Sequence, residues 1–218
     1  MKAASNAVLT PLAAATWVLR AARGKEAATA AGFRARFGLP PAAAAAVGRE
    51  RGGEVEGGGE REGPLLWLHA ASVGEARTAL AVLSRVERWR AEETAATDGS
   101  EGSRGGSSRP RLRALLSTGT VGGAAVGVAA AAARRSAHAA ADPGAVSEVS
   151  MLSHAHVPFD VPWCCERFLR RHSPRAGIFI ESELWPSLLG AAAGQGVPMA
   201  LLDGRMGEVR SSAAAMFL

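Results

Sequence analysis

Short apolar runs alternate with amphipathic stretches along most of this chain. The apolar runs predict strands at 65–70, 112–117, 146–152, 176–180 and 197–202. Apolar residues three and four positions apart predict helices at 76–90, from about 124, at 162–172 and at 184–194. Strands and helices that alternate in this way are typical of a parallel sheet with right-handed crossovers. The pattern therefore predicts the α/β class, with helices flanking one parallel sheet.

Three segments break this pattern. Residues 48–63 and 92–110 are rich in Gly, Ser, Glu and Arg and lack apolar periodicity, so we interpret both as disordered insertions. A third segment, 134–146, is rich in Ala and ends in Asp142-Pro143-Gly144, which favours a turn. The predicted domain extends over 37–218, with the two insertions inside it.

The first 36 residues form a segment of a different kind. Residues 7–22 are mostly apolar but contain Pro11 and Arg20, so no run reaches the roughly 18 apolar residues that span a bilayer. Three interpretations of 1–36 stay open: a helix on an anionic membrane surface, an organellar transit peptide, or an Ala-rich helix docked on the domain. The basic residues that follow the apolar run favour the first two: Arg23, Lys25, Arg34 and Arg36.

Composition narrows the function classes. The chain has 218 residues, 48% of them hydrophobic, which suits one domain with a sizeable core. Lys and Arg number 25 against 20 Asp and Glu, and this net charge of +5 mildly favours anionic partners. Cys164 and Cys165 are adjacent and are the only two Cys, which excludes a Cys-ligated zinc site and a secreted disulfide scaffold. Six Phe, five Trp and no Tyr argue against an aromatic platform for nucleic acid.

Candidate chemistry gathers beyond the carboxyl ends of the predicted strands, where open parallel sheets bind ligands. Four polar or Gly-rich segments fall there: 72–75, 117–123, 181–186 and 203–205. The turn at 117–123 offers backbone amides to an anion. It lacks the Lys and spacing of a P-loop, and it is not GxGxxG. The sequence therefore predicts a polar site at this edge without a nucleotide motif.

Glu75 has two competing interpretations. Ser72 and Glu75 have the spacing of a capping box, which would make Glu75 a structural residue at the start of a helix. Alternatively, Glu75 is a general base beside a cleft and is kept ionised by the helix N-terminus. One side chain cannot easily serve both roles.

Two further carboxylates follow the apolar strand at 176–180. Glu183 is expected to cap the helix that starts near Leu184, whereas Glu181 is expected to lie half-buried at the sheet edge. Glu75 and Glu181, from separate strands, would form a pair suited to proton transfer and to a cationic transition state.

The remaining polar clusters give weaker signals. His154 and His156, with Asp160 nearby, are a weak metal signal, and we expect hydrogen-bonded loop histidines instead. The basic residues around His172 are interpreted as a solvated helix end, or as a face for an acidic ligand: Arg170, Arg171 and Arg175.

Taken together, these segments resemble the N-terminal half of the 3-deoxy-D-manno-octulosonic acid (Kdo) transferases, which add Kdo to lipid A. The most specific strings are Ser72-Val73-Gly74-Glu75 and Glu181-Ser182-Glu183-Leu184-Trp185-Pro186. The resemblance covers most of 33–218 except the two insertions. Its other matching pieces are 34–38, 67–71, 117–123, His154 with 157–162, 167–169, 187–189, 198–205 and 210–211.

The resemblance implies one Rossmann-like half of a glycosyltransferase-B fold, the half that binds the acceptor. It implies transfer of Kdo from CMP-Kdo to a lipid A precursor, without a metal or other cofactor and without nucleic acid. Glu75 aligns with the family's catalytic base, and Glu181 aligns with the acid that stabilises the transition state. We assign substrate contacts to the residues around them: Ser72, Gly74, Thr118, Thr120, Glu183 and Arg205.

The resemblance also implies a location at a membrane surface. That surface would be the cytoplasmic face of the inner membrane in a bacterium, or it would lie in the mitochondrion in a plant or green alga.

The chain departs from the family pattern in several places. The family's C-terminal, donor-binding half is expected to be missing, and two glycines replace larger residues in the turn at 117–123. Residues 203–207 differ from the family's Asn-Ala-Arg-Leu-Ser run, and His156 stands where an aromatic residue is usual. We therefore expect weak or no turnover from the chain alone. A truncated, non-catalytic relic that binds an anionic lipid or a partner is the alternative, whereas Glu75 and Glu181 together argue against a different two-half glycosyltransferase.

Overall fold

The computed structural model describes residues 2–24, 30–39, 63–98, 110–140, 149–181 and 185–203. Its centre is a five-stranded sheet with all strands parallel, in the order β3-β2-β1-β4-β5. This strand order is that of a Rossmann-like domain, and it confirms the predicted α/β class. The strands are β1 (Leu65–Ala70), β2 (Leu112–Thr118), β3 (Val149–His156), β4 (Ala176–Ile180) and β5 (Met199–Leu202).

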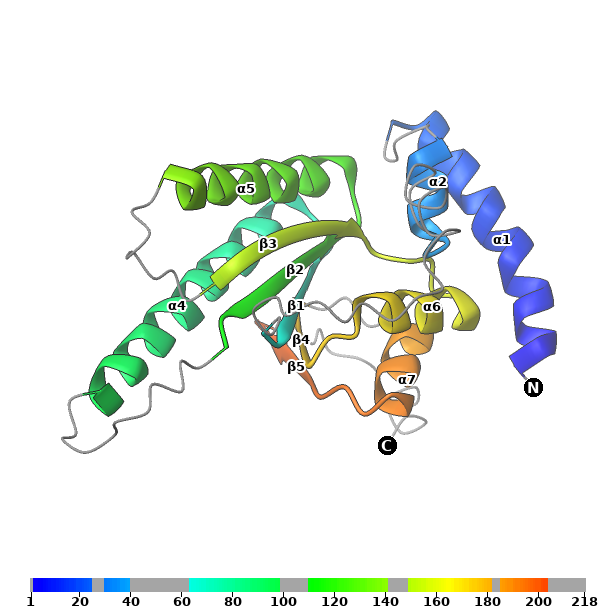
Figure 1. Cartoon of the computed structure of the whole chain (residues 1–218). Coiled ribbons are helices and arrows are strands. Elements are labelled where there is room, and N and C mark those ends of the chain that lie inside the picture. Colours follow the sequence, from blue (N-terminus) through cyan, green and yellow to red (C-terminus); the bar gives the residue numbers. More distant parts are fainter. Residues whose placement is uncertain are drawn as a thin grey trace, which may run out of the picture.

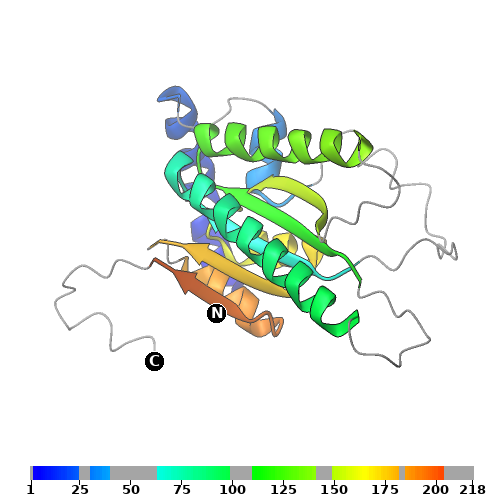
Figure 2. The ribbon, with the colours of Figure 1, turned by 90° about the vertical axis from the view of Figure 1, so that its left-hand side faces the viewer.

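Helices cover both faces of the sheet (Figures 1 and 2). One face is covered by α4 (Val73–Asp98) and α5 (Val121–Ala140), and the other by α6 (Pro162–His172) and α7 (Pro186–Gly194). The two N-terminal helices are α1 (Lys2–Ala22), which contacts α6, and α2 (Ala30–Arg36), which contacts β3.

Strand β1 divides the core into two layers, because successive strand residues point to opposite faces. Leu68 packs with Leu83 and other apolar residues of the α4 and α5 layer. Trp67 packs with Phe168 in the α6 and α7 layer. Each of these four side chains is at most 2% exposed. Burial of such a side chain stabilises the fold by about 1.5–3 kcal/mol, so the sheet and its two edges are firmly placed.

The N-terminal helices are docked on the domain. Nε1 of Trp163 in α6 donates to Oγ1 of Thr10 in α1 at 3.0 Å. Phe37, directly after α2, packs against the rings of Phe159 and Trp163. Of the three interpretations of 1–36, these contacts favour the docked helix. The predicted boundary at residue 36 falls inside a packed cluster, since Arg36 and Phe37 are both buried.

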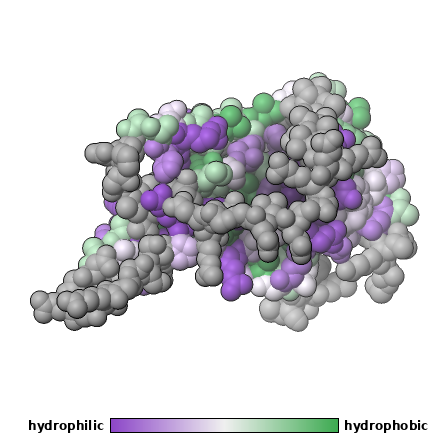
Figure 3. Space-filling model, viewed as in Figure 1, coloured by the Kyte–Doolittle hydropathy of each residue, from purple (hydrophilic) through white to green (hydrophobic). Residues whose placement is uncertain are grey.

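The outer side of α1 is apolar. Four of its side chains are between 56% and 68% exposed: Val8, Leu12, Val18 and Leu19. Figure 3 shows apolar residues (green) at the surface beside α1 and over α5, where Val128 is also exposed. Among the described residues, no helix combines the length and hydropathy needed to cross a membrane.

Two segments predicted as irregular are in part helical. Helix α4 continues to Asp98, so the insertion expected at 92–110 is wrong for 92–98. Helix α5 continues to Ala140, so the soft region expected at 134–146 is wrong for 134–140. Ala and Glu favour helix, and an ion pair between Arg134 and Glu87 ties the two helices together. The remaining parts of these predictions lie outside the described residues: 48–62, 99–109 and 141–148.

The third strand also differs from the prediction. It covers Val149–His156 instead of 146–152, so His154 and His156 are strand residues and not loop residues. Pairing with β2 explains the extension, because Leu116 is registered with His154 and Thr118 with His156.

Candidate active site

The carboxyl ends of neighbouring strands bring the two predicted carboxylates to one edge. The last registered pair between β1 and β4 is His69 with Phe179. Two residues beyond this pair, the chain reaches Ala71 on one strand and Glu181 on the other. Ala71, which precedes the turn before Glu75, and Glu181 therefore lie next to each other.

Glu75 lies in the first turn of α4 and is 8% exposed. Its backbone N–H donates to Oγ of Ser72 at 3.2 Å, and its Oε2 accepts the N–H of Ala71 at 2.7 Å. The predicted capping arrangement is therefore present, with Ala71 in place of Ser72 as the backbone donor to Glu75. The other carboxylate oxygen, Oε1, forms no hydrogen bond with the described residues. Capping and base chemistry are thus compatible, because they use different oxygens of one carboxylate.

Two hydroxyls that we predicted to contact substrate lie at the end of β2 and in the turn that follows it. Thr118 is 0% exposed, and its Oγ1 lies 2.9 Å from Nε2 of His154. Thr120 is partly exposed, and its Oγ1 accepts the N–H of Gly123 at 3.2 Å, which caps α5. A ligand can therefore reach Thr120 directly, whereas the buried Thr118 stabilises the turn through its contact with His154.

Glu181 has an unusual backbone. Its φ is 62°, in the left-handed region, and its N–H donates to the carbonyl of Leu202 at 2.8 Å. Asp203, directly after β5, has a φ of 55°. For residues other than Gly this conformation costs about 1 kcal/mol, and such strain concentrates at functional sites. The polar residues that directly follow β4 and β5 are therefore both held in strained backbone conformations at the predicted edge.

A buried polar network lies beneath the edge, and no pattern in the sequence predicted its hydrogen bonds. Oγ of Ser117 accepts a hydrogen bond from Nε1 of Trp67 at 2.8 Å and lies 3.0 Å from Nδ1 of His69. Burial lowers the pKa of His69 to about 4, the contact with Ser117 opposes this shift, and the charge of Arg36 adds to it. His69 is therefore neutral at neutral pH. Its Nε2 has no hydrogen-bond partner among the described residues. Two sequence signals included His69: the apolar run, which indicated a buried strand, and the resemblance at 67–71, which assigned His69 no role.

The remaining predicted site residues, Glu183 and Arg205, lie outside the described residues. The capping role expected for Glu183 therefore stays a prediction, and the described residues show a cap from another element. Helix α7 has Trp185 at its N-cap position without a side-chain cap, and Oδ1 of Asp160 accepts the N–H of Leu188 at 2.9 Å. No local sequence pattern predicts this cap, because Asp160 lies 28 residues before Leu188.

The weak metal signal has a structural explanation. His154 is bonded to Thr118, and Asp160 caps α7. Within the described ranges, no group of three or more His, Cys, Asp or Glu side chains is placed to hold a metal ion. Burial raises the pKa of Cys164 to about 12, so its thiol stays protonated.

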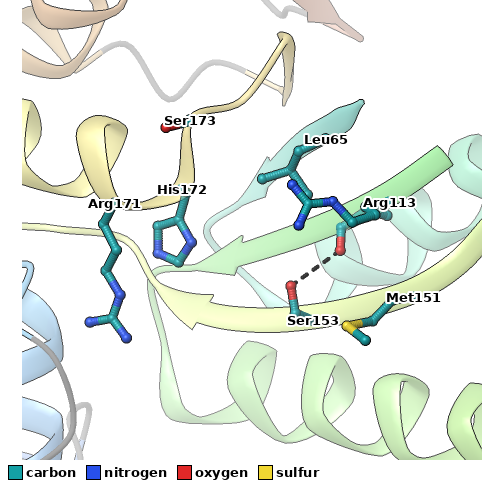
Figure 4. Close-up of a pocket in the computed structure, with 8 residues that line it drawn as sticks. Leu65, Arg113, Met151, Ser153, Arg171, His172 and Ser173 are labelled. Carbon is teal, nitrogen blue, oxygen red and sulfur yellow. Dashed lines mark hydrogen bonds between the residues drawn. The ribbon is translucent and has the colours of Figure 1, made fainter. Parts of the chain in front are cut away.

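A cavity of about 330 Å³ lies at a different place, near the amino ends of β1, β2 and β3 (Figure 4). Oγ of Ser153 donates to the carbonyl of Ala114 at 3.3 Å, and this bond is drawn in Figure 4. Burial and the charge of Arg171 lower the pKa of His172 to about 4. No carboxylate is among the residues that line this cavity: Leu65, Arg113, Ala114, Met151, Ser153, Arg171, His172 and Ser173. It therefore lacks carboxylates like those at the carboxyl ends of the strands.

A parallel sheet in this strand order, with polar turns beyond the ends of its strands, defines a Rossmann-like domain and is consistent with the N-terminal half of a glycosyltransferase of the B type. The family model described as 3-deoxy-D-manno-octulosonic-acid transferase (kdotransferase) matches residues 31–217. The chain belongs to this Kdo transferase family and corresponds to its N-terminal domain.

Individual relatives agree with this assignment. The chain is 35% identical over 144 residues to the 3-deoxy-D-manno-octulosonic acid transferase of Bordetella pertussis, an alignment that covers 64% of this chain and 25% of that protein. It is 29% identical over 145 residues to a probable mitochondrial 3-deoxy-D-manno-octulosonic acid transferase of Arabidopsis thaliana, covering 66% and 24%. It is 28% identical over 129 residues to the Rickettsia prowazekii enzyme of the same name, covering 59% and 20%. The alignments span about a quarter or less of each relative.

Proposed function

We propose that this chain is the acceptor-binding half of a glycosyltransferase that moves Kdo from CMP-Kdo to a lipid A precursor. The observation that carries the proposal is the state of Glu75. One carboxylate oxygen is fixed by the Ala71 N–H, and the other makes no hydrogen bond with the described residues. A general base needs this combination of fixed orientation and a free lone pair.

In the proposed reaction, Oε1 of Glu75 accepts the proton of an acceptor sugar hydroxyl as that oxygen attacks the anomeric carbon of Kdo. The position of Glu75 in the first turn of α4 supports this role, because the helix N-terminus stabilises a negative charge there. Positive charge builds up on the Kdo ring as the bond to CMP breaks, and Glu181 stabilises it from the neighbouring turn. The register that sets Glu181 beside Ala71 supports the pairing of these two carboxylates.

The remaining substrate contacts are proposed for the residues that surround the pair. Ser72 and Gly74 belong to the turn that presents Glu75, and Thr120 is partly exposed beside the N-terminus of α5. Thr118 is assigned a supporting part, since its hydroxyl lies against His154. Glu183 and Arg205 complete the set.

A membrane surface is the proposed place of action. The exposed apolar side of α1 supports this proposal, because its residues face solvent on a helix that is already docked on the domain: Val8, Leu12, Val18 and Leu19. The membrane would be the bacterial inner membrane, on its cytoplasmic face, or a mitochondrial membrane in a plant or green alga.

A second candidate is a non-catalytic protein that binds an anionic lipid or a partner. The observation that favours it is the apolar side of α1, where Val8, Leu12 and Leu19 are between 57% and 68% exposed. An exposed apolar surface of this kind binds a lipid or a partner protein without any catalytic step.

A transfer assay separates the two candidates. It uses CMP-Kdo and a tetra-acylated lipid A precursor, with the chain alone and with the C-terminal half of the Bordetella pertussis relative added. We expect transfer only in the supplemented assay. Lipid binding without transfer in either arm would support the non-catalytic candidate, and the absence of both would contradict both.

A further inference from the structure

Two arginines from the N-terminal helices donate to one carbonyl at the polar edge. Nη2 of Arg36 lies 2.5 Å from the carbonyl oxygen of Gly119, and Nη2 of Arg20 lies 3.0 Å from the same atom. A second donor of Arg36, Nη1, reaches the carbonyl of Val157 at 2.8 Å. A carbonyl oxygen has two lone pairs, so it can accept both guanidinium groups. We refer to Arg20, Arg36 and the Gly119 carbonyl as the arginine clamp.

The burial of Arg36 indicates that its guanidinium depends on the hydrogen bonds of the clamp. Arg36 is 2% exposed, although its guanidinium is always charged in a protein. Burying a charge costs several kcal/mol unless hydrogen bonds offset it. A planar guanidinium that bridges the carbonyls of Gly119 and Val157 holds the ends of β2 and β3 in one arrangement. A Lys ammonium lacks this rigid fork of donors.

Gly119 in turn contacts the segment that holds Glu75. Its N–H donates to the carbonyl of Ala70 at 3.3 Å. A Cβ at Gly119 would lie 3.3 Å from both Cα and the carbonyl oxygen of Ala71, so the two backbones are in close contact. The N–H of Ala71 is the donor to Oε2 of Glu75 at 2.7 Å. A displacement of Gly119 therefore moves the peptide that orients Glu75.

We propose that Arg20 and Arg36 are positioning residues for Glu75 and act through Gly119 and Ala71. Helices α1 and α2 are then structural parts of the site. The effect of the clamp on transfer rests on the proposed function of Glu75 as the base, whereas its effect on the Ala71–Glu75 contact does not.

The test measures hydrogen exchange of individual backbone amides by NMR on the full chain. The variants are Arg20→Ala and Arg36→Lys, because Arg36→Ala empties a buried site and risks unfolding. Arg23→Ala is the matched control, since Arg23 follows the same helix and its side chain is exposed. We expect exchange at the Ala71 amide to accelerate roughly fivefold to tenfold in both clamp variants, which is the effect of losing one net hydrogen bond. The strand amides of Leu68 and Leu116 should not change.

Two results would overturn the proposal. One is exchange at Ala71 that matches the Arg23→Ala control. The other is equal acceleration at Ala71, Leu68 and Leu116, which would mean that the clamp only stabilises the whole domain. In the supplemented transfer assay, both clamp variants should lower kcat roughly tenfold and leave KM for CMP-Kdo unchanged. The unsubstituted chain could fail to transfer Kdo while both clamp variants still accelerate exchange at Ala71. This combination would refute the proposed function and leave the proposal for the clamp standing.

Discussion

The strands of the sheet begin at its amino edge and end at its carboxyl edge, and polar groups form different contacts at these two edges. At the amino edge, the hydroxyls of Ser153 and Ser173 both donate to backbone carbonyls, and the left-handed backbone of Ser173 ends α6 in an ordinary C-cap. At the carboxyl edge, Glu75 has an oxygen without a described partner, and Glu181 is left-handed directly after a strand. The amino edge has a cavity of about 330 Å³ but no carboxylate in its lining. A carboxylate oxygen without a described hydrogen-bond partner and a strained backbone therefore identify the candidate site better than the size of a cavity does.

The largest expected effect is at Glu75. Glu75→Gln should lower kcat in the supplemented assay by roughly 100- to 10,000-fold, because the base is lost. The free energy of unfolding should change by less than about 1 kcal/mol, because a Gln oxygen can still accept the Ala71 N–H. Kinetics and urea unfolding measure the two quantities. Glu92→Gln, exposed on the same helix, is the control. A loss of stability that parallels the loss of activity would reduce Glu75 to its capping role.

A substitution at Glu181 should lower activity without lowering stability. Glu181→Gly removes the carboxylate and relieves the left-handed strain, so activity should fall roughly 100-fold while stability stays equal or rises by up to about 1 kcal/mol. Asp203→Gly is the matched control, because Asp203 has the same backbone conformation and no assigned chemistry. Thermal unfolding and the supplemented assay measure both variants. Equal activity in the two variants would remove Glu181 from the proposed site.

Buried histidines should make stability depend on pH, more strongly at the carboxyl edge. The folded pKa of His69, about 4, lies below its ordinary value of 6.5, so the unfolded chain takes up the proton first as the pH falls. This contribution to stability is complete above about pH 7 and declines as the pH falls toward 4, by about 1 kcal/mol between roughly pH 7.5 and pH 5.5.

His69→Asn should remove that decline, since an Asn amide can still reach Ser117 and does not titrate. His172→Asn, at the partly exposed amino-edge position, should remove less. Urea unfolding at the two pH values gives the comparison, with the exposed His138→Asn as the control. An unchanged pH dependence in His69→Asn would mean that His69 is protonated in the folded protein.

The smallest effect is expected at the amino edge. Arg171→Ala should change transfer in the supplemented assay by less than roughly twofold and stability by no more than about 0.5 kcal/mol, because an exposed side chain away from the carboxylates is removed. A loss of transfer comparable to that of Glu75→Gln would move the site to the cavity.

Local patterns predicted much of the fold, because the relevant interactions are local. The helix at 162–172 begins and ends as predicted, with Pro162 at its first position and a left-handed C-cap at Ser173. The strands at 65–70 and 176–180 are also confirmed residue for residue. By contrast, β3 extends through small and polar residues to His156, since pairing with β2 outweighs their weak strand preference.

The site was predictable only in part. The spacing of Ser72 and Glu75 predicted the bond from the Glu75 N–H to Ser72, because the partners are three residues apart, but the Glu75 carboxylate accepts the N–H of Ala71 instead of that of Ser72. The contacts of Arg20 and Arg36 with Gly119 join residues 99 and 83 positions apart, and no periodicity in the sequence reports such pairs. The left-handed backbone of Glu181 was not predictable from the sequence either, since Glu has no preference for that conformation.

Acceptor binding at the carboxyl ends of the strands is tested most directly by locating the acceptor on the folded chain. A photoreactive derivative of the tetra-acylated lipid A precursor would be crosslinked to the chain and the labelled peptides identified by mass spectrometry. We predict labels in 71–75 and 119–121, at the carboxyl edge. Labels confined to Arg113, Ser153 and 171–173 would place the acceptor in the amino-edge cavity and contradict acceptor binding beside Glu75.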